Sequence, residues 1–357
     1  MAIVHVGPWK TGTTEIQNYI HRHSKTLKLD GFLTLPIDVS NETNMSSAKL
    51  AKELAKAGNG LAPCFGQEMG YGPKCSKGLW KKIVSFLHKS EHKHQSIIIS
   101  AEQFQNVKMN ITLLEKTLRE EGNFTRIKIV VGYRRVYDWL KSSYFQMHRP
   151  DFQMHRPEVA KSEDVFPSLV EEIIDMIRIV KNVHTRALVE RYNEHFQDVA
   201  IFNMYATKPM VAQFFCKIII APRTCTAILQ TPQTRKVNGR GWNLDLHRLV
   251  IAAKKKSMLE ADASSQKAVK ALGLKELPND LPRQCLSKEN MATLLQLSLK
   301  EESELLPRFF QSAEGEAKLR EDFLLASNTS LCSLDVDEVL RDELWKDFVL
   351  EIGNTLL

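Results

Sequence analysis

The first twenty residues constrain the fold of this chain more than any other stretch. Residues 2–6 form a short apolar run that is typical of a buried strand, and a glycine-containing turn follows at 7–14. Ile16, Tyr19 and Ile20 have the spacing of the apolar face of a helix. Amide groups at a helix N-terminus lack partners inside the helix, so this strand–turn–helix predicts an anion site. Its expected binding residues are Lys10, Thr11, Gly12, Thr13 and Thr14.

The position of the lysine indicates which anion is expected. A nucleoside-triphosphate P-loop has the form G-x-x-x-x-G-K-[ST], with the lysine after the second glycine. Gly7 and Gly12 have that spacing, but Lys10 stands two residues before Gly12. No later apolar strand ends in an aspartate suited to hold magnesium. The order Lys-Thr-Gly-Thr-Thr instead resembles the 5′-phosphosulfate loop of sulfotransferases that use 3′-phosphoadenosine 5′-phosphosulfate (PAPS).

A second motif is a carboxylate after an apolar strand. Residues 96–100 are predicted to form a buried strand, and Glu102 follows it. Open α/β sheets bind ligands at the carboxyl ends of their strands, which favours a catalytic role. A simpler interpretation is that Glu102 only complements a helix dipole. The Ser-x-Glu order resembles carbohydrate-type sulfotransferases, and the resemblance implies that Glu102 is the general base; cytosolic sulfotransferases use a histidine instead.

The third motif follows the next strand, expected at 127–133. Sulfotransferases bind the 3′-phosphate of the nucleotide with an arginine after such a strand and a serine eight residues later. Arg134 and Ser142 have this spacing, although the proline that usually follows the arginine is missing. Arg135 and Ser143 are less favoured alternatives, and the segment is also compatible with a plain amphipathic helix.

A basic loop at 231–243 resembles the late Arg-Lys-Gly loop of the family in only two residues. Arg235 and Lys236 match it and are expected to contact the 3′-phosphate, but Val237 stands where the glycine belongs.

Alternation of strands and helices predicts an α/β fold with a parallel sheet. The resemblance implies a three-layer P-loop-like fold, in which helices flank a central parallel sheet. We expect residues 1–243 to form the PAPS-binding core, with an insertion at 38–95 on the acceptor side. Residues 244–357 are expected to form a mainly helical C-terminal extension packed on the core.

The net charge indicates which ligands the chain favours, and the composition does not determine its cellular compartment. The chain has 357 residues and a net charge of +7, which suits anionic ligands but lacks the dense basic stripe of a nucleic-acid binder. No apolar run reaches the roughly 20 residues of a membrane span. The chain is expected in the cytoplasm if it is complete, and in the Golgi lumen if an upstream anchor is missing.

Two further patterns favour the lumen. N-x-[ST] sequons occur at five positions, namely Asn41, Asn44, Asn110, Asn123 and Asn328. The six cysteines allow pairing within segments as 64–75, 216–225 and 285–332, although connectivity does not follow from sequence.

Together these motifs resemble a PAPS-dependent sulfotransferase, which implies in-line transfer of a sulfuryl group to a hydroxyl or amine of an acceptor, a carbohydrate or a small molecule. In this hypothesis Glu102 takes the acceptor's proton and Lys10 stabilises the leaving oxygen. No metal is expected, since cysteines and histidines lack metal-ligand spacing. A kinase-like phosphotransferase and a non-catalytic nucleotide binder remain as alternatives. The sequence indicates neither the acceptor nor the oligomeric state.

Overall fold

The computed structural model describes residues 1–8, 11–34, 85, 88, 94–105, 109–148, 166–231, 243–259, 280–329 and 331–354. Contacts between Cα atoms divide the chain into two compact units. Unit 1 comprises Met1–Arg135 and Val180–Arg235, and unit 2 comprises Val136–Ile179 and Lys236–Leu357. Residues 136–179 therefore belong with the C-terminal helices, whereas the sequence-based boundary lay at 243.

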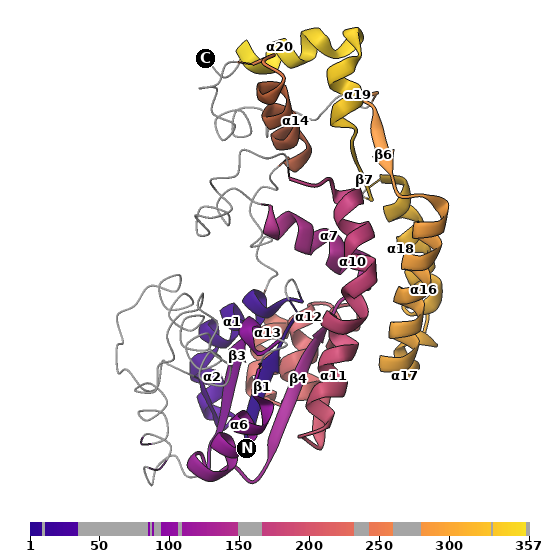
Figure 1. Cartoon of the computed structure of the whole chain (residues 1–357). Helices are drawn as coiled ribbons and strands as arrows, with labels where there is room; N and C mark the ends of the chain where they lie inside the picture. Colours follow the sequence, from indigo (N-terminus) through magenta and orange to yellow (C-terminus); the bar gives the residue numbers. More distant parts are fainter. Residues whose placement is uncertain are drawn as a thin grey trace. The chain divides into compact units, whose positions relative to one another are not determined.

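Unit 1 is built on a sheet of five parallel strands in the order β2-β3-β1-β4-β5. Figure 1 labels the neighbouring strands β3, β1 and β4. Their bounds are β1 (Ala2–Val6), β2 (Phe32–Thr34), β3 (Ser96–Ala101), β4 (Ile127–Tyr133) and β5 (Asp198–Asn203). These strands coincide with the apolar runs of the sequence because a parallel sheet is buried on both faces. All five side chains of β1 are buried accordingly.

Helices cover both faces of this sheet, which confirms the α/β class. One face packs against α1 (Thr13–Arg22), α2 (Ser24–Leu29), α12 (Met210–Ala212), the π-helical turn η4 (Gln213–Ile218) and α13 (Pro222–Gln230). The other face packs against α6 (Ile111–Lys116), the π-helical turn η3 (Thr117–Glu121) and α11 (Thr185–Asn193). Alternate side chains of each strand enter the two cores, so Ile3 lies in one and Val4 in the other.

Unit 2 is mainly helical in the residues described. Its larger helices are α7 (Val136–Met147), most of α10 (Leu169–Val183), α14 (Leu244–Lys255), α16 (Lys288–Leu305) and α18 (Glu316–Thr329). The short elements are α17 (Pro307–Phe310), α19 (Val336–Arg341), η5 (Glu343–Trp345) and α20 (Lys346–Asn354). Strands β6 (Arg283–Cys285) and β7 (Cys332–Leu334) pair antiparallel.

Side-chain caps explain where several helices begin. Ser168 and Glu171 form a reciprocal capping box at the start of α10, since each side chain accepts the other's amide hydrogen. The helices α14, α16 and α19 have one-way caps, in which the side chains of Asn243, Ser287 and Asp335 each accept an amide hydrogen three residues ahead.

Two disulfides are present in the described part of the chain. Cys216 pairs with Cys225 in unit 1, and Cys285 pairs with Cys332 in unit 2, where the two residues face each other across β6 and β7. Both pairs are among those that the spacing allowed; Cys64 and Cys75 lie outside the described residues. None of the helices in the described ranges is both long and apolar enough to span a bilayer.

Candidate functional site

The turn between β1 and α1 presents an uncapped helix N-terminus. Gly12 occupies the N-cap position in the left-handed conformation, with φ of 82°, and no side chain among the described residues caps the helix. Glycine adopts this conformation at little cost, which explains the residue type. The turn is closed by Thr11, whose amide and hydroxyl both donate to the carbonyl oxygen of Pro8, at 3.2 and 2.7 Å. Its hydroxyl therefore holds the turn closed, a role that the sequence did not reveal.

Two further glycines allow the turn to pack closely. A Cβ at Gly7 would clash with the hydroxyls of Thr11 and Thr13, and a Cβ at Gly132 of β4 would clash with the side chain of Thr11. Thr185 of α11 fixes Gly132 from another direction, because its hydroxyl donates to the Gly132 carbonyl at 2.8 Å. The turn is thus held against β4, the strand that leads into Arg134.

The two predicted threonine donors differ in environment. Thr14 is exposed, whereas Thr13 is 2% exposed. The Oγ1 atom of Thr13 is buried and has no hydrogen-bond partner among the described residues. Buried hydroxyls normally have a hydrogen-bond partner. The Thr13 hydroxyl is therefore able to donate to a ligand bound at this helix N-terminus. A bound phosphosulfate oxygen is an acceptor that would satisfy it, so the turn fits the anion that the sequence predicts.

The carboxyl ends of three neighbouring strands meet at this edge of the sheet. In the parallel register, Val6 of β1 pairs with Ala101 of β3 and with Val131 of β4. Glu102 follows β3 directly as the first residue of the turn η2 (Glu102–Gln105), and Arg134 follows β4. After β1 the chain continues to β2 on one side of the sheet, and after β4 it continues to β5 on the other side. Such a switch point is where open α/β sheets form a ligand crevice.

The structure distinguishes Arg134 from its neighbour. Arg135 is 1% exposed, its guanidinium carbon lies 4.5 Å from the centroid of the Tyr205 ring, and its amide donates to the Tyr205 hydroxyl at 3.3 Å. Arg134 is half-buried and remains accessible. This favours Arg134 as the ligand-binding residue and gives Arg135 a structural role.

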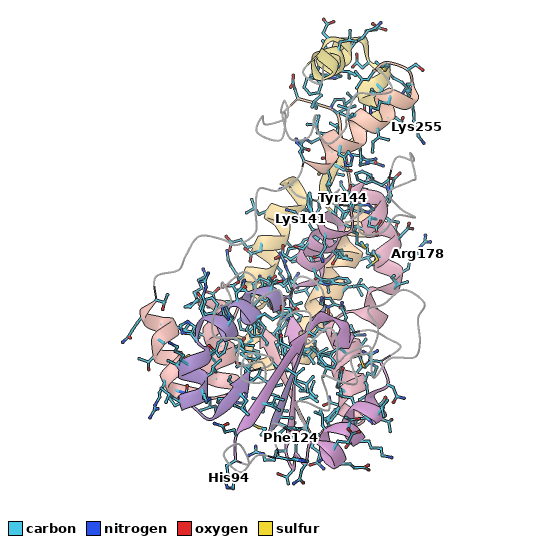
Figure 2. All side chains as sticks on the ribbon, turned by 90° about the vertical axis from the view of Figure 1, so that its left-hand side faces the viewer. His94, Phe124, Lys141, Tyr144, Arg178 and Lys255 are labelled. Atoms are coloured by element: carbon cyan, nitrogen blue, oxygen red, sulfur yellow. A yellow bond between two sulfur atoms is a disulfide. The ribbon has the colours of Figure 1, made fainter. Side chains whose placement is uncertain are left out.

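The serines that follow lie on α7 in unit 2. Ser142 is half-buried, whereas Ser143 is 2% exposed and its hydroxyl has no partner among the described residues. Figure 2 labels Lys141 and Tyr144, which bracket them on this helix. The assignment of Ser142 to the 3′-phosphate stays a prediction.

Several predicted site residues fall outside the part of the chain that the structure describes. These are Lys10, Arg235 and Lys236, together with the side chain of Glu102, for which the structure gives only the course of the backbone.

A buried polar group that sequence reasoning missed lies beneath the turn. His5 on β1 is fully buried, and its Nδ1 lies 2.9 Å from the hydroxyl of Ser100 on β3. Gln17 of α1 donates to the Ser100 carbonyl, also at 2.9 Å. Burial lowers the pKa of His5 from 6.5 to about 3, so the ring is neutral. The signal was available in the sequence as a histidine and a serine inside two apolar strands.

Glu15 adds a carboxylate to the first turn of α1. It is partly buried, and desolvation raises its pKa. A negatively charged ligand at this helix N-terminus would shift the pKa of Glu15 in the same direction as desolvation does.

The structure shows no group of three or more histidine, cysteine, aspartate or glutamate side chains suited to hold a metal ion within the described ranges. A scan of the chain against protein-family models finds no match, and searches of curated proteins and of solved structures find none either.

Proposed function

We propose that this protein is a sulfotransferase that moves the sulfuryl group of PAPS to a hydroxyl or amine of an acceptor. The observation that carries the proposal is the N-terminus of α1, which has Gly12 at its N-cap position and lies at the end of the central strand, with Arg134 after the neighbouring strand. An uncapped helix N-terminus favours a phosphate or sulfate group. The half-buried Arg134 at the same edge of the sheet favours binding of a second phosphate group.

Each residue has a distinct role in this proposal. The amides at the start of α1 and the Thr13 hydroxyl bind the 5′-phosphosulfate, and Arg134 binds the 3′-phosphate. PAPS supplies an activated sulfuryl group when bound. Glu102 removes the proton of the acceptor, and Lys10 stabilises negative charge on the leaving oxygen. The Ser-x-Glu order after β3 resembles that of carbohydrate-type sulfotransferases and supports a carbohydrate acceptor.

Nucleotide preference provides the first test. Calorimetry should detect 3′,5′-adenosine diphosphate binding, and binding of ATP with magnesium should be much weaker. Arg134→Ala should lower the affinity for 3′,5′-adenosine diphosphate by roughly 10–100-fold, the loss expected for a hydrogen bond to a charged group. The affinity for adenosine 5′-phosphate, which lacks the 3′-phosphate, should change little. Arg126→Ala is the matched control, because Arg126 is an exposed arginine before the same strand. Equal losses for the two nucleotides would remove the role given to Arg134, and a preference for ATP would indicate the kinase-like alternative.

Transfer activity provides the second test. An acceptor screen with labelled PAPS should detect product with the unaltered chain, and Lys10→Ala should abolish it. Glu102→Gln should lower turnover by roughly 10²–10⁴-fold while nucleotide affinity stays close to that of the unaltered protein. Full activity of Glu102→Gln would show that another group is the base. Nucleotide binding without transfer to any of a broad set of acceptors would favour a non-catalytic binder.

A further inference from the structure

Three of the five sequon asparagines of this chain are residues that the structure describes, and their environments differ. Asn110 is the N-cap of α6, and its side-chain oxygen accepts the amide hydrogen of Leu113 at 2.9 Å. Asn328 lies within the last turn of helix α18. Asn123 stands in the turn between η3 and β4. Asn41 and Asn44 lie outside the described ranges.

The turn at Asn123 presents both functional residues of its sequon. Asn123 and Thr125 are exposed, while Phe124 between them is 7% exposed. The Phe124 amide donates to the Leu118 carbonyl at 3.1 Å, and its side chain belongs to the core on that face of the sheet. The buried ring therefore anchors the turn and directs its two neighbours outward.

The backbone and side chain of Asn123 also fit an acceptor role. Its φ of 53° is in the left-handed region, which asparagine tolerates better than most residues. Its side chain has no hydrogen bond to any residue in the described part of the chain, in contrast to Asn110. The amide nitrogen of Asn123 is thus exposed without a competing partner.

The disulfides favour an oxidising compartment for this chain. Cys216–Cys225 and Cys285–Cys332 link positions in both units, and no cysteine of the described residues is free. Structural disulfides form and persist in oxidising compartments and are rare where thiols are kept reduced. In eukaryotic cells the oxidising lumen of the secretory pathway is also where N-linked glycans are attached.

We infer that Asn123 carries an N-linked glycan. In the attachment step the side-chain amide nitrogen of Asn123 forms a bond to the anomeric carbon of an oligosaccharide carried on a lipid diphosphate. The bond from that carbon to the diphosphate breaks, the lipid diphosphate leaves with the electron pair, and the amide loses one proton. The Thr125 hydroxyl completes the recognition motif.

A glycan at Asn123 would not obstruct the candidate site. Asn123 precedes β4 and Arg134 follows it, so the seven residues of the strand separate them by about 23 Å at the usual rise per residue. Figure 2 labels Phe124 and His94 at the end of unit 1 where β4 and β3 begin. A glycan here projects from the sheet edge opposite the turn at Gly12. The inference does not depend on the proposed function.

The decisive measurement is peptide mapping of the protein purified from the cells that make it. The peptide containing Asn123 is expected to carry a glycan that peptide N-glycosidase removes with conversion of Asn123 to aspartate. An unmodified Asn123 peptide would overturn the inference.

Variants produced in the same cells separate glycosylation from a purely structural role of the turn. Thr125→Ala should lose the glycan and Thr125→Ser should keep it, because serine preserves the sequon. Asn123→Gly should lose the glycan while the turn persists, because glycine adopts positive φ readily. Retention of the same glycan mass in Asn123→Gly would assign the modification to another position and contradict the inference.

Discussion

The buried His5 makes the stability of unit 1 depend on pH in a way that can be calculated. The ring lies between β3 and the aromatic side chains of Phe202 and Phe214, at centroid distances of 6.2 and 5.4 Å. Desolvation is the cause of its lowered pKa, so a proton placed on it in the folded state would have no countercharge. The perturbation is acidification, compared between the unaltered protein and His5→Gln, which is neutral at every pH.

Proton linkage gives the direction and magnitude of the change in the free energy of unfolding with pH. The folded-state pKa of about 3 lies below the value of 6.5 taken for the unfolded chain, so the unfolded state binds more protons between these values. Stability therefore falls as pH falls through 6.5, and the loss is complete only below about pH 3. At about pH 5 the expected loss relative to neutral pH is about 2 kcal/mol, a factor of about 30 in the opening equilibrium.

Hydrogen exchange of peptides from β1 measures this locally, with rates corrected for the intrinsic effect of pH. Protection of these amides should fall about 30-fold between neutral pH and about pH 5 in the unaltered protein. In His5→Gln this part of the change should disappear, whatever the starting stability of the variant, since contributions of other histidines cancel in the comparison. An equal loss of protection in both proteins would refute the reasoning and show that His5 is not buried as a neutral ring.

Three other changes have expected results. Gly132→Ala should lower the free energy of unfolding by about 1–3 kcal/mol in chemical denaturation, because its Cβ meets the Thr11 side chain; a neutral effect would mean that the turn does not pack on β4. Ile220→Gly should raise stability by about 0.5–1 kcal/mol in thermal unfolding, because Ile220 has a φ of 58° and the left-handed region costs roughly 1–2 kcal/mol; a decrease would argue against that strain. Replacing Cys285 and Cys332 by alanine should destabilise unit 2 by about 4 kcal/mol, from the 47-residue separation of the pair, and unchanged urea unfolding would show that the crosslink adds no constraint.

The central sheet could be predicted from the sequence because its strands are short apolar runs bounded by polar residues. Residues 127–133 were predicted as a strand and form β4 with those bounds. The order of the strands and the two helical layers depend on long-range packing, which periodicity does not encode. The π-helical turn η4 is an example, since its sequence is equally compatible with a continuous α-helix from α12 onward.

The candidate site was predictable in part. The turn motif identified the uncapped N-terminus at Gly12, because glycine spacing reports backbone conformation directly. Sequence spacing favoured Arg134 over Arg135 but could not show that Arg135 is buried, since the fold decides which way adjacent side chains point. The hydrogen bond between His5 and Ser100 joins residues 95 positions apart and requires the register of β1 and β3.

Capping side chains mark the start of a helix more clearly than apolar spacing marks its end. The side chain of Asp335 caps α19 by accepting the amide hydrogen of Glu338, three residues ahead. The apolar spacing of Leu340, Leu344 and Phe348 continues beyond this helix, but α19 ends at Arg341. Asp342 then caps a new turn by accepting the Leu344 amide hydrogen. A second capping aspartate inside an apolar pattern was the signal for this break.

The chain passes between the two units three times, after residues 135, 179 and 235. Neither unit is therefore continuous in sequence, and β5 of unit 1 is synthesised only after α7 of unit 2. During synthesis on the ribosome, α7 emerges roughly 150 residues before α16, the helix against which it packs. A nascent chain that stops near residue 243 would therefore expose the apolar side of α7, because α16 has not yet been made. The sheet of unit 1 can form at that point, whereas unit 2 can form only after the C-terminal helices are synthesised.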